Sequence, residues 1–263
     1  MLSGACHNAY ASALNREQVS GLYTQAVSMF RQANELALTS PERAKALYQK
    51  SAMRFERIVN DGGIENGKLY YNIGNAYFRM NDLGMAILNY RRAEMFTPGD
   101  ANLQHNLQYA RSRRLDRIEE EQKTQVLKTL FFWHYDLSPK TRFTLLSIVS
   151  ALFWATAFAR LFYKRPMLLK TLGFSAILAI LVAGSLAVEH MSIGKTEPGV
   201  IIAPAVTARK GNSDTYEPAF KEPLHAGTEF SLVGESGNWF HIKLMDSRKC
   251  WVPKTSALLV RPS

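Results

Sequence analysis

Histidine and cysteine are the residues of this sequence with the widest catalytic and metal-binding chemistry. Its six histidines are scattered, no pair has the spacing of metal ligands near an acidic partner, and the motif H-E-x-x-H is absent. The two cysteines, Cys6 and Cys250, are too few for a disulfide framework or a cysteine-rich zinc site. Glu189-His190 lies at the edge of an apolar segment, where an interfacial position is the better interpretation. We therefore expect no metal site.

One short motif is superficially similar to the turn that presents a catalytic serine. In Gly234-Glu-Ser236-Gly237 the second glycine comes one residue too early, and no strand-to-helix context surrounds it, so we predict a β-turn. The acidic residues Asp116 and 119–121 are predicted to form a helix face and not a paired-carboxylate site. The sequence contains no glycine-rich phosphate loop, dinucleotide fingerprint or calcium loop. We expect no catalytic residue, no cofactor and no enzymatic activity.

The net charge of +10 is typical of nucleic-acid-binding proteins, but its distribution argues against that function. Residues 1–139 carry 17 basic and 14 acidic side chains, residues 140–170 carry 6 and none, and residues 171–263 carry 9 and 8. The excess therefore flanks two apolar segments, where cations reach lipid headgroups and set topology. Arg111-Ser-Arg113-Arg114 is followed at once by glutamates, so we predict a solvated helix face. No nucleic-acid partner is expected.

Residues 15–125 are predicted to form an all-α domain. Apolar residues recur at three- and four-residue spacing from Leu22 to Leu36, and Ser40-Pro41-Glu42 opens a second helix with proline at its first position. Residues 1–14 precede this domain. Ala11-Ser12-Ala13 fits a signal-peptidase site, yet no long apolar run precedes it, so this segment is either the remnant of a signal or an ordinary terminus.

Residues 67–100, GKLYYNIGNAYFRMNDLGMAILNYRRAEMFTPGD, closely resemble one 34-residue tetratricopeptide repeat. Gly74 and Ala86 are small where the two helices must approach closely. One repeat cannot bury its own face, so residues 15–60 and a helix over residues 101–121 are expected to pack beside it. The matching signature positions are Tyr70, Ile73, Gly74 and Tyr77 in the first helix and Ala86, Tyr90, Ala93 and Pro98 in the second.

The helix over residues 101–121 is predicted to close the domain as a solvating cap. Leu103, Leu107 and Leu115 are expected on its inner face. The resemblance also implies that the first helix of the repeat lines a concave surface. Amide, aromatic and guanidinium groups there could hold an extended peptide or a chain terminus. The candidate partner-binding residues are Tyr71, Asn72, Asn75, Phe78 and Arg79, although Asn72 and Asn75 are also ordinary choices in such repeats.

Two apolar segments predict a transmembrane hairpin. Residues 143–163 and 171–188 approach the roughly 20 residues that span a bilayer core of about 30 Å. The loop at 164–170 is basic and is predicted to be cytoplasmic, which puts both flanking domains outside the cytoplasm. The alternative is a pair of buried or interfacial helices. Linkers are expected at residues 126–142 and 189–198.

Residues 199–263 predict a small all-β barrel. Five short β-rich runs alternate with turn signals. The segment resembles bacterial SH3-like domains through Val206–Gly211, Leu224–Phe230, Gly237–Ile242 and Trp251-Val252. Cys250 stands where the family often has glycine, which weakens any carry-over of ligand binding. The alternation of residues predicts that at least one of Trp239 and Trp251 belongs to the core.

The complete order of domains resembles the BatE-like proteins of the bacterial aerotolerance (Bat) group. That resemblance implies a two-pass protein of the bacterial inner membrane. It further implies a scaffold in the cell envelope, whose partners include von Willebrand-type membrane proteins and a MoxR-type ATPase. The alternative function is a cell-wall adaptor whose SH3-like domain binds peptidoglycan or regulates a wall hydrolase.

Overall fold

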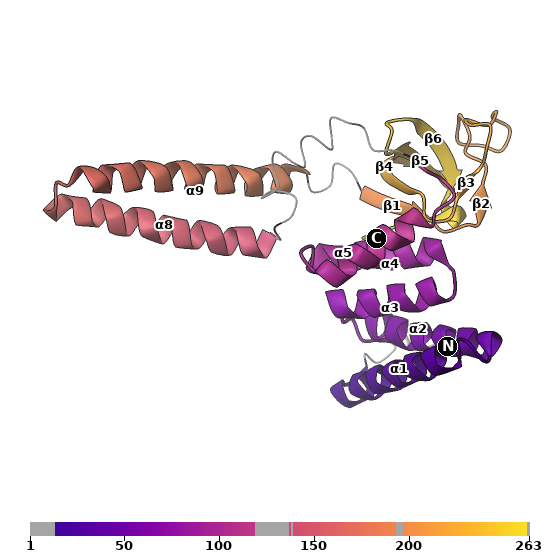
Figure 1. The fold of residues 1–263 in the computed structure, drawn as a ribbon. Helices are drawn as coiled ribbons and strands as arrows, with labels where there is room; N and C mark the ends of the chain where they lie inside the picture. Colours follow the sequence, from indigo (N-terminus) through magenta and orange to yellow (C-terminus); the bar gives the residue numbers. More distant parts are fainter. Residues whose placement is uncertain (1–13, 119–136, 138, 193–196, 262–263) are drawn as a thin grey trace, which may run out of the picture.

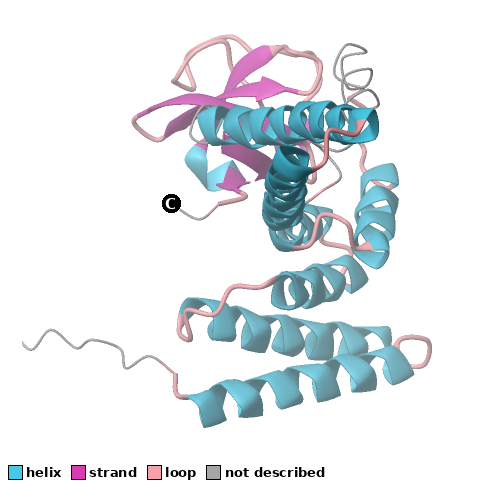
Figure 2. Ribbon diagram, turned by 90° about the vertical axis from the view of Figure 1, so that its left-hand side faces the viewer, coloured by secondary structure: helices cyan, strands magenta, loops and turns pink. Residues whose placement is uncertain are grey.

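The computed structural model describes residues 14–118, 137, 139–192 and 197–261. Five helices are stacked one beside the next, an antiparallel sheet packs against one end of the stack, and two long helices form a separate hairpin (Figures 1 and 2). The stacked helices are α1 (Arg16–Leu36), α2 (Pro41–Asn60), α3 (Gly67–Arg79), α4 (Leu83–Phe96) and α5 (Ala101–Ser112). The predicted signal segment and the linker at 126–136 lie outside the described residues.

Side-chain caps define where four of the five stacked helices begin, and Pro41 opens α2 without one. Asn15 and Gln18 form a reciprocal capping box at the start of α1, and Asn66 accepts a hydrogen bond from the backbone N–H of Leu69 in α3. Asp82 and Asp100 accept the same kind of bond in α4 and α5. Each cap satisfies backbone donors that have no partner within the helix. The turns between the helices are therefore set by local sequence.

The α3–α4 pair packs through a close approach at Gly74. A Cβ atom at this position would lie 2.6 Å from Cδ1 of Tyr90, so any larger residue requires the tyrosine ring to move. Tyr70, Ile73 and Tyr90 are almost completely buried, as the sequence predicts, together with Ile87. Tyr77 is only half-buried, and its hydroxyl donates to Glu56 of α2 over 2.7 Å. Most buried residues of the helices form one apolar cluster, and Ala33, Ala44 and Tyr48 form a smaller one between α1 and α2.

The predicted cap helix is shorter than expected. Leu103 and Leu107 are buried as predicted, but α5 ends at Ser112, and Leu115 is 75% exposed instead of lying on an inner face. The described residues that follow Ser112, 113–118, are not helical, and Asp116 reaches the sheet instead of continuing an acidic helix face.

The hairpin consists of α8 (Pro139–Phe162) and α9 (Pro166–Ser192). Each contains a 23-residue stretch that is long and apolar enough to cross a membrane, about 34 Å at 1.5 Å per residue. Little of either stretch is buried within the protein, and Trp154 is 70% exposed. The helix α8 begins at Pro139 and not at residue 143. The helix α9 begins at Pro166 and not at residue 171, so the basic loop is shorter than the predicted 164–170. Proline at 166 begins α9 because it needs no helical N–H donor there.

The early start of α8 brings Arg142 into the helix pair. Its side chain is 3% exposed, and its Nη1 donates to the hydroxyl of Ser185 in α9 over 2.9 Å. A charged group inside an apolar hairpin is costly unless polar groups surround it. The contact therefore ties the first turn of α8 to the second half of α9.

The sheet has five antiparallel strands in the order β6-β5-β4-β1-β7, and a two-stranded pair, β2-β3, lies beside it. Two of these strands, β3 and β7, were not predicted because they are only two and three residues long. The interior contains Ile201, Phe230, Ile242 and Val252. The strands are β1 (Glu197–Ile201), β2 (Ala205–Val206), β3 (Leu224–His225), β4 (Glu229–Ser236), β5 (Trp239–Leu244), β6 (Lys249–Pro253) and β7 (Ala257–Leu259).

Candidate functional site

Four of the five predicted partner-binding residues lie together in one groove. Tyr71, Asn75, Phe78 and Arg79 project from α3 into a space of about 580 Å³. The other walls come from α1, α4, α5 and the residue after α5, so four helices of the stack line the groove. Those wall residues are Phe30, Tyr90, Asn106, Tyr109 and Arg113.

Asn72 does not line this groove. It lines a smaller neighbouring hollow of about 140 Å³ with Val27, Arg31 and Phe55. Phe30 borders both spaces, so the aromatic ring of α1 separates them. Asn72 therefore belongs to the edge of the candidate site and not to its centre.

A hydrogen-bond network forms the floor of the groove. Nδ2 of Asn106 donates to the hydroxyl of Tyr71 over 2.9 Å and to Oδ1 of Asn75 over 3.0 Å. The hydroxyl of Tyr90 donates to the same Oδ1 over 2.8 Å. Burial raises the pKa of Tyr90 above its usual range, so this hydroxyl keeps its proton. Asn75 therefore joins α3, α4 and α5.

The rim of the groove combines aromatic rings with positive charge. The rings of Phe78 and Tyr109 lie 5.6 Å apart at an angle of 55°, and Tyr109 is 50% exposed. Within the described parts of the chain, neither Arg79 nor Arg113 forms an ion pair. Two guanidinium groups without carboxylate partners, beside exposed rings, favour an acidic ligand.

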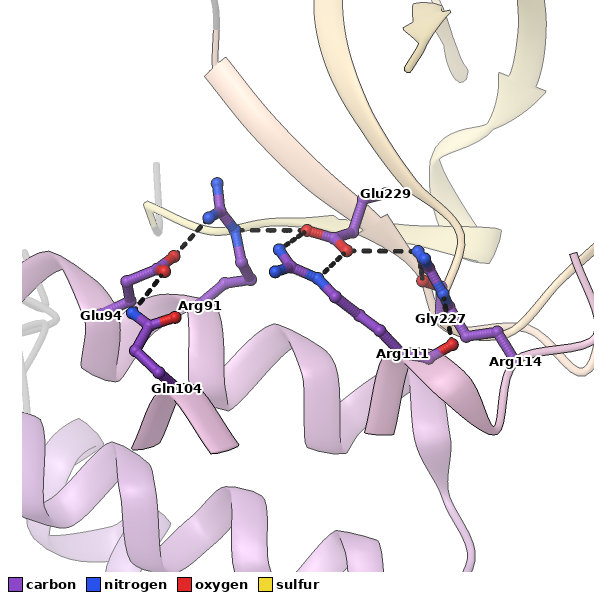
Figure 3. A network of polar contacts seen from close by, with 7 residues as sticks. All are labelled: Arg91, Glu94, Gln104, Arg111, Arg114, Gly227 and Glu229. Carbon is purple, nitrogen blue, oxygen red and sulfur yellow. Dashed lines mark hydrogen bonds and ion pairs between the residues drawn. The ribbon is translucent and has the colours of Figure 1, made fainter. Parts of the chain in front are cut away.

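A second polar cluster joins the helices to the sheet around Glu229 (Figure 3). Arg111 of α5 donates from Nε and Nη2 to the two carboxylate oxygens, each over 2.7 Å. Nη1 of Arg114 lies 3.2 Å from Oε1 of Glu229, and Nε of Arg91 lies 3.4 Å from Oε2. The Glu229 side chain is only 7% exposed, so this carboxylate is buried among three arginines.

Two opposing effects set the pKa of Glu229. Burial on its own raises the pKa, because it penalises the charged form. The hydrogen bonds from Arg111 and the positive charges of Arg111, Arg91 and Arg114 outweigh that effect and hold the pKa below its usual range. Glu229 is therefore ionised at neutral pH and serves as the anionic centre of the junction.

Asp116 makes a second link between the two parts. Its carboxylate accepts hydrogen bonds from the backbone N–H of His225 over 2.7 Å and from the hydroxyl of Thr228, and Oδ1 lies 2.7 Å from Nδ1 of His225. Burial raises the pKa of Asp116, but these hydrogen bonds outweigh it and lower the pKa from its usual value. Asp116 thus has a structural role in the junction.

Apolar contacts and a fourth arginine complete the junction. Val200 of β1 and Val260 belong to the same buried cluster as Tyr90 and Ile87 of the helices. Arg92 of α4 donates to the backbone carbonyls of Leu259 over 3.2 Å and of Val260 over 3.0 Å. The sheet therefore covers part of α4, although the sequence predicted that the helix over residues 101–121 alone would close the stack.

The sequence predicted Arg111 and Arg114 on a solvated helix face, which is wrong because both contact Glu229.

The groove residues that the sequence analysis missed had a signal in the sequence. Asn106, Tyr109 and Arg113 lie one repeat length of 34 residues after Asn72, Asn75 and Arg79. The Glu229 cluster had no comparable local signal.

Comparison with known protein families, curated proteins and solved structures gives no match to this chain. Within the described residues, His, Cys, Asp and Glu side chains form no group of three that could hold a metal ion. The groove and the junction are therefore interpreted from their own geometry.

Proposed function

We propose that this chain is a non-enzymatic, membrane-anchored scaffold that holds an acidic segment of a protein partner in the groove across α1, α3 and α5. One observation carries the proposal: Arg79, Arg113 and the exposed ring of Tyr109 line the same groove. Neither arginine has an acidic partner within the described residues. Aromatic residues and arginine are the usual anchors of protein interfaces. Charge-assisted hydrogen bonds to a carboxylate give such a contact both strength and direction.

The proposal includes the finer identities that the sequence resemblances imply. The helical part is a tetratricopeptide-repeat domain, the sheet is a bacterial SH3-like domain, and the protein is a BatE-like member of the Bat group. The close approach of α3 and α4 at Gly74 supports the first identity. The antiparallel order of the five-stranded sheet is compatible with the second. Expected partners are the von Willebrand-type membrane proteins of that group.

The proposed location is the bacterial inner membrane, with two spans. The direct contacts of α4 and α5 with the sheet require both parts to lie on one side of the bilayer, and an even number of spans satisfies this. Lys164 and Arg165 lie between the two helices and favour a cytoplasmic position for that end. Both soluble parts are then extracytoplasmic.

A site-specific crosslink tests the scaffold proposal in the full-length membrane protein. A photoreactive amino acid replaces Tyr109, and the crosslinked protein is identified by mass spectrometry in cells. Adding Arg79→Ala and Arg113→Ala should reduce the yield at least tenfold, since truncated interface anchors each cost roughly 2 kcal/mol. Arg16→Ala with Arg43→Ala removes the same charge from exposed positions outside the groove and should preserve the yield. An unchanged yield in the Arg79/Arg113 variant would reject the groove as the site.

A further inference from the structure

The outer face of strands β5 and β6 is a second surface whose composition differs from that of the groove. Side chains alternate strictly along both strands, so Phe240, Ile242 and Val252 point into the core. The opposite side carries Trp239, His241, Lys243, Lys249 and Trp251, and we call it the β5–β6 outer face. Both tryptophans are half-buried on it, so the prediction that one of them belongs to the core is wrong.

Open space above Gly234, which we call the slot, lies beside the stacked rings at the centre of this face. The imidazole of His241 and the indole of Trp251 are paired across the strands, with centroids 4.6 Å apart and planes only 12° from parallel. On the other side of His241, the paired position in β4 is Gly234. A Cβ atom at Gly234 would meet no atom within 4 Å, so one face of the imidazole borders an unfilled position.

Unpaired positive charge flanks this slot. Lys243 and Lys249 are directly opposite each other in the β5–β6 register, and neither forms an ion pair within the described part of the chain. Like charges at opposed positions destabilise a sheet, and an anionic ligand would relieve the repulsion. The charge of Lys249, after the larger effect of burial, also lowers the pKa of His241, so the imidazole is neutral at pH 7.

We propose that the β5–β6 outer face binds a short acidic peptide segment that carries an aromatic side chain. The aromatic ring occupies the space above Gly234 and stacks on the imidazole of His241, and carboxylates lie beside Lys243 and Lys249. Offset stacking of this kind contributes beyond simple area burial, and the lysines supply the charge complementarity.

The border of the surface favours a short peptide over a long polyanion. Glu235 pairs with Lys254, Glu217 with Lys210, and Asp246 with Arg248, so these three cations already have acidic partners. Arg209, which pairs with Trp251 in the backbone, donates to the carbonyl of Tyr216. Single-stranded nucleic acid binds along a continuous positive groove with several stacking positions. Here the unpaired lysines are confined to one end of a single slot.

Binding is measured with the full-length protein in detergent micelles and a fluorescein-labelled peptide of alternating glutamate and tyrosine, by fluorescence anisotropy. Gly234→Leu should weaken binding at least tenfold because its side chain fills the slot. Gly21→Leu is the matched control, since a Cβ at that exposed helical position also meets no atom within 4 Å. Thermal unfolding of both variants confirms that the fold is intact.

Charge and ligand class are tested separately. Lys243→Glu with Lys249→Glu should abolish binding, whereas Lys50→Glu with Lys68→Glu, which changes net charge equally at exposed helical positions, should not. A peptide of alternating glutamate and glycine should bind at least tenfold more weakly than the tyrosine peptide. Equal binding of the two peptides, or loss of binding in the Arg79/Arg113 variant instead, would overturn the proposal. Preferential binding of oligothymidylate or of purified cell-wall sacculi would also overturn it.

Discussion

Arg111 and Glu229 are 118 positions apart in the chain, yet they form a two-pronged ion pair in which both N–O distances are 2.7 Å. Two neighbouring arginines, Arg91 and Arg114, also reach the same carboxylate. Because the glutamate is buried, the polar contacts of three arginines across this junction depend on one side chain.

Glu229→Gln is expected to lower the free energy of unfolding by about 3 kcal/mol, because it leaves three arginines around a neutral group. Thermal unfolding of the detergent-solubilised protein measures the effect. Glu217→Gln is the control, since its ion pair with Lys210 is exposed to solvent and should contribute little to stability. Equal stability of the Glu229 variant and the wild type would show that the cluster does not stabilise the junction.

Acid should weaken the junction. The folded-state pKa values of Glu229 and Asp116 lie below their ordinary values of 4.5 and 3.8. Their contribution to stability is therefore complete above about pH 5 and is lost as pH falls through the ordinary pKa values towards the folded ones. The unfolding midpoint of the wild type should fall more steeply below pH 5 than that of Glu229→Gln. Parallel pH curves would contradict this assignment.

Gly74→Leu is expected to destabilise the protein by about 1–3 kcal/mol, because its side chain must displace the ring of Tyr90. Gly21→Leu adds the same side chain in open space on α1 and should leave stability equal or higher. Chemical denaturation followed by circular dichroism compares the two. Similar losses for both variants would mean that Gly74 does not mark a close helix approach.

The membrane topology can be tested with single cysteines in a variant that lacks Cys6 and Cys250. A cysteine at Pro166 should be protected from a membrane-impermeant thiol reagent in whole cells. Cysteines at Ser20 and Asp214, one in each soluble part, should both react. Labelling of only one of the latter two would show that the helices and the sheet lie on opposite sides of the membrane.

The structure gives Asn75 a second role. The sequence analysis predicts it only as a partner-binding residue of the concave surface, together with Arg79. Asn75 accepts hydrogen bonds from Tyr90 and Asn106, so we now expect its truncation to loosen the groove floor by about 1 kcal/mol. Deletion of residues 199–263 would expose the core at Val260, so point variants are the cleaner test.

The features that could be predicted from the sequence are those specified by nearby residues. The α3–α4 pair follows from small residues and caps within 34 positions, and the hairpin follows from two uninterrupted apolar runs. The sequence analysis predicted only the wall of the groove that α3 forms. It missed the residues of the facing wall, among them Asn106 and Arg113. The contacts of Arg111 and Asp116 are made with groups more than 100 residues away in the sequence, and no local periodicity predicts such contacts.

Arg92 of α4 donates to the carbonyl of Val260, so this contact can form only after the last strand has been made. The ribosome makes the helical stack first, then both helices of the hairpin, and only afterwards the strand residues that cover α4. Until Val200 and Val260 arrive, the apolar face of α4 has no cover from the sheet, and Glu229 is not yet present to neutralise Arg111. The buried core of the helical stack is therefore completed only after the whole hairpin has been synthesised.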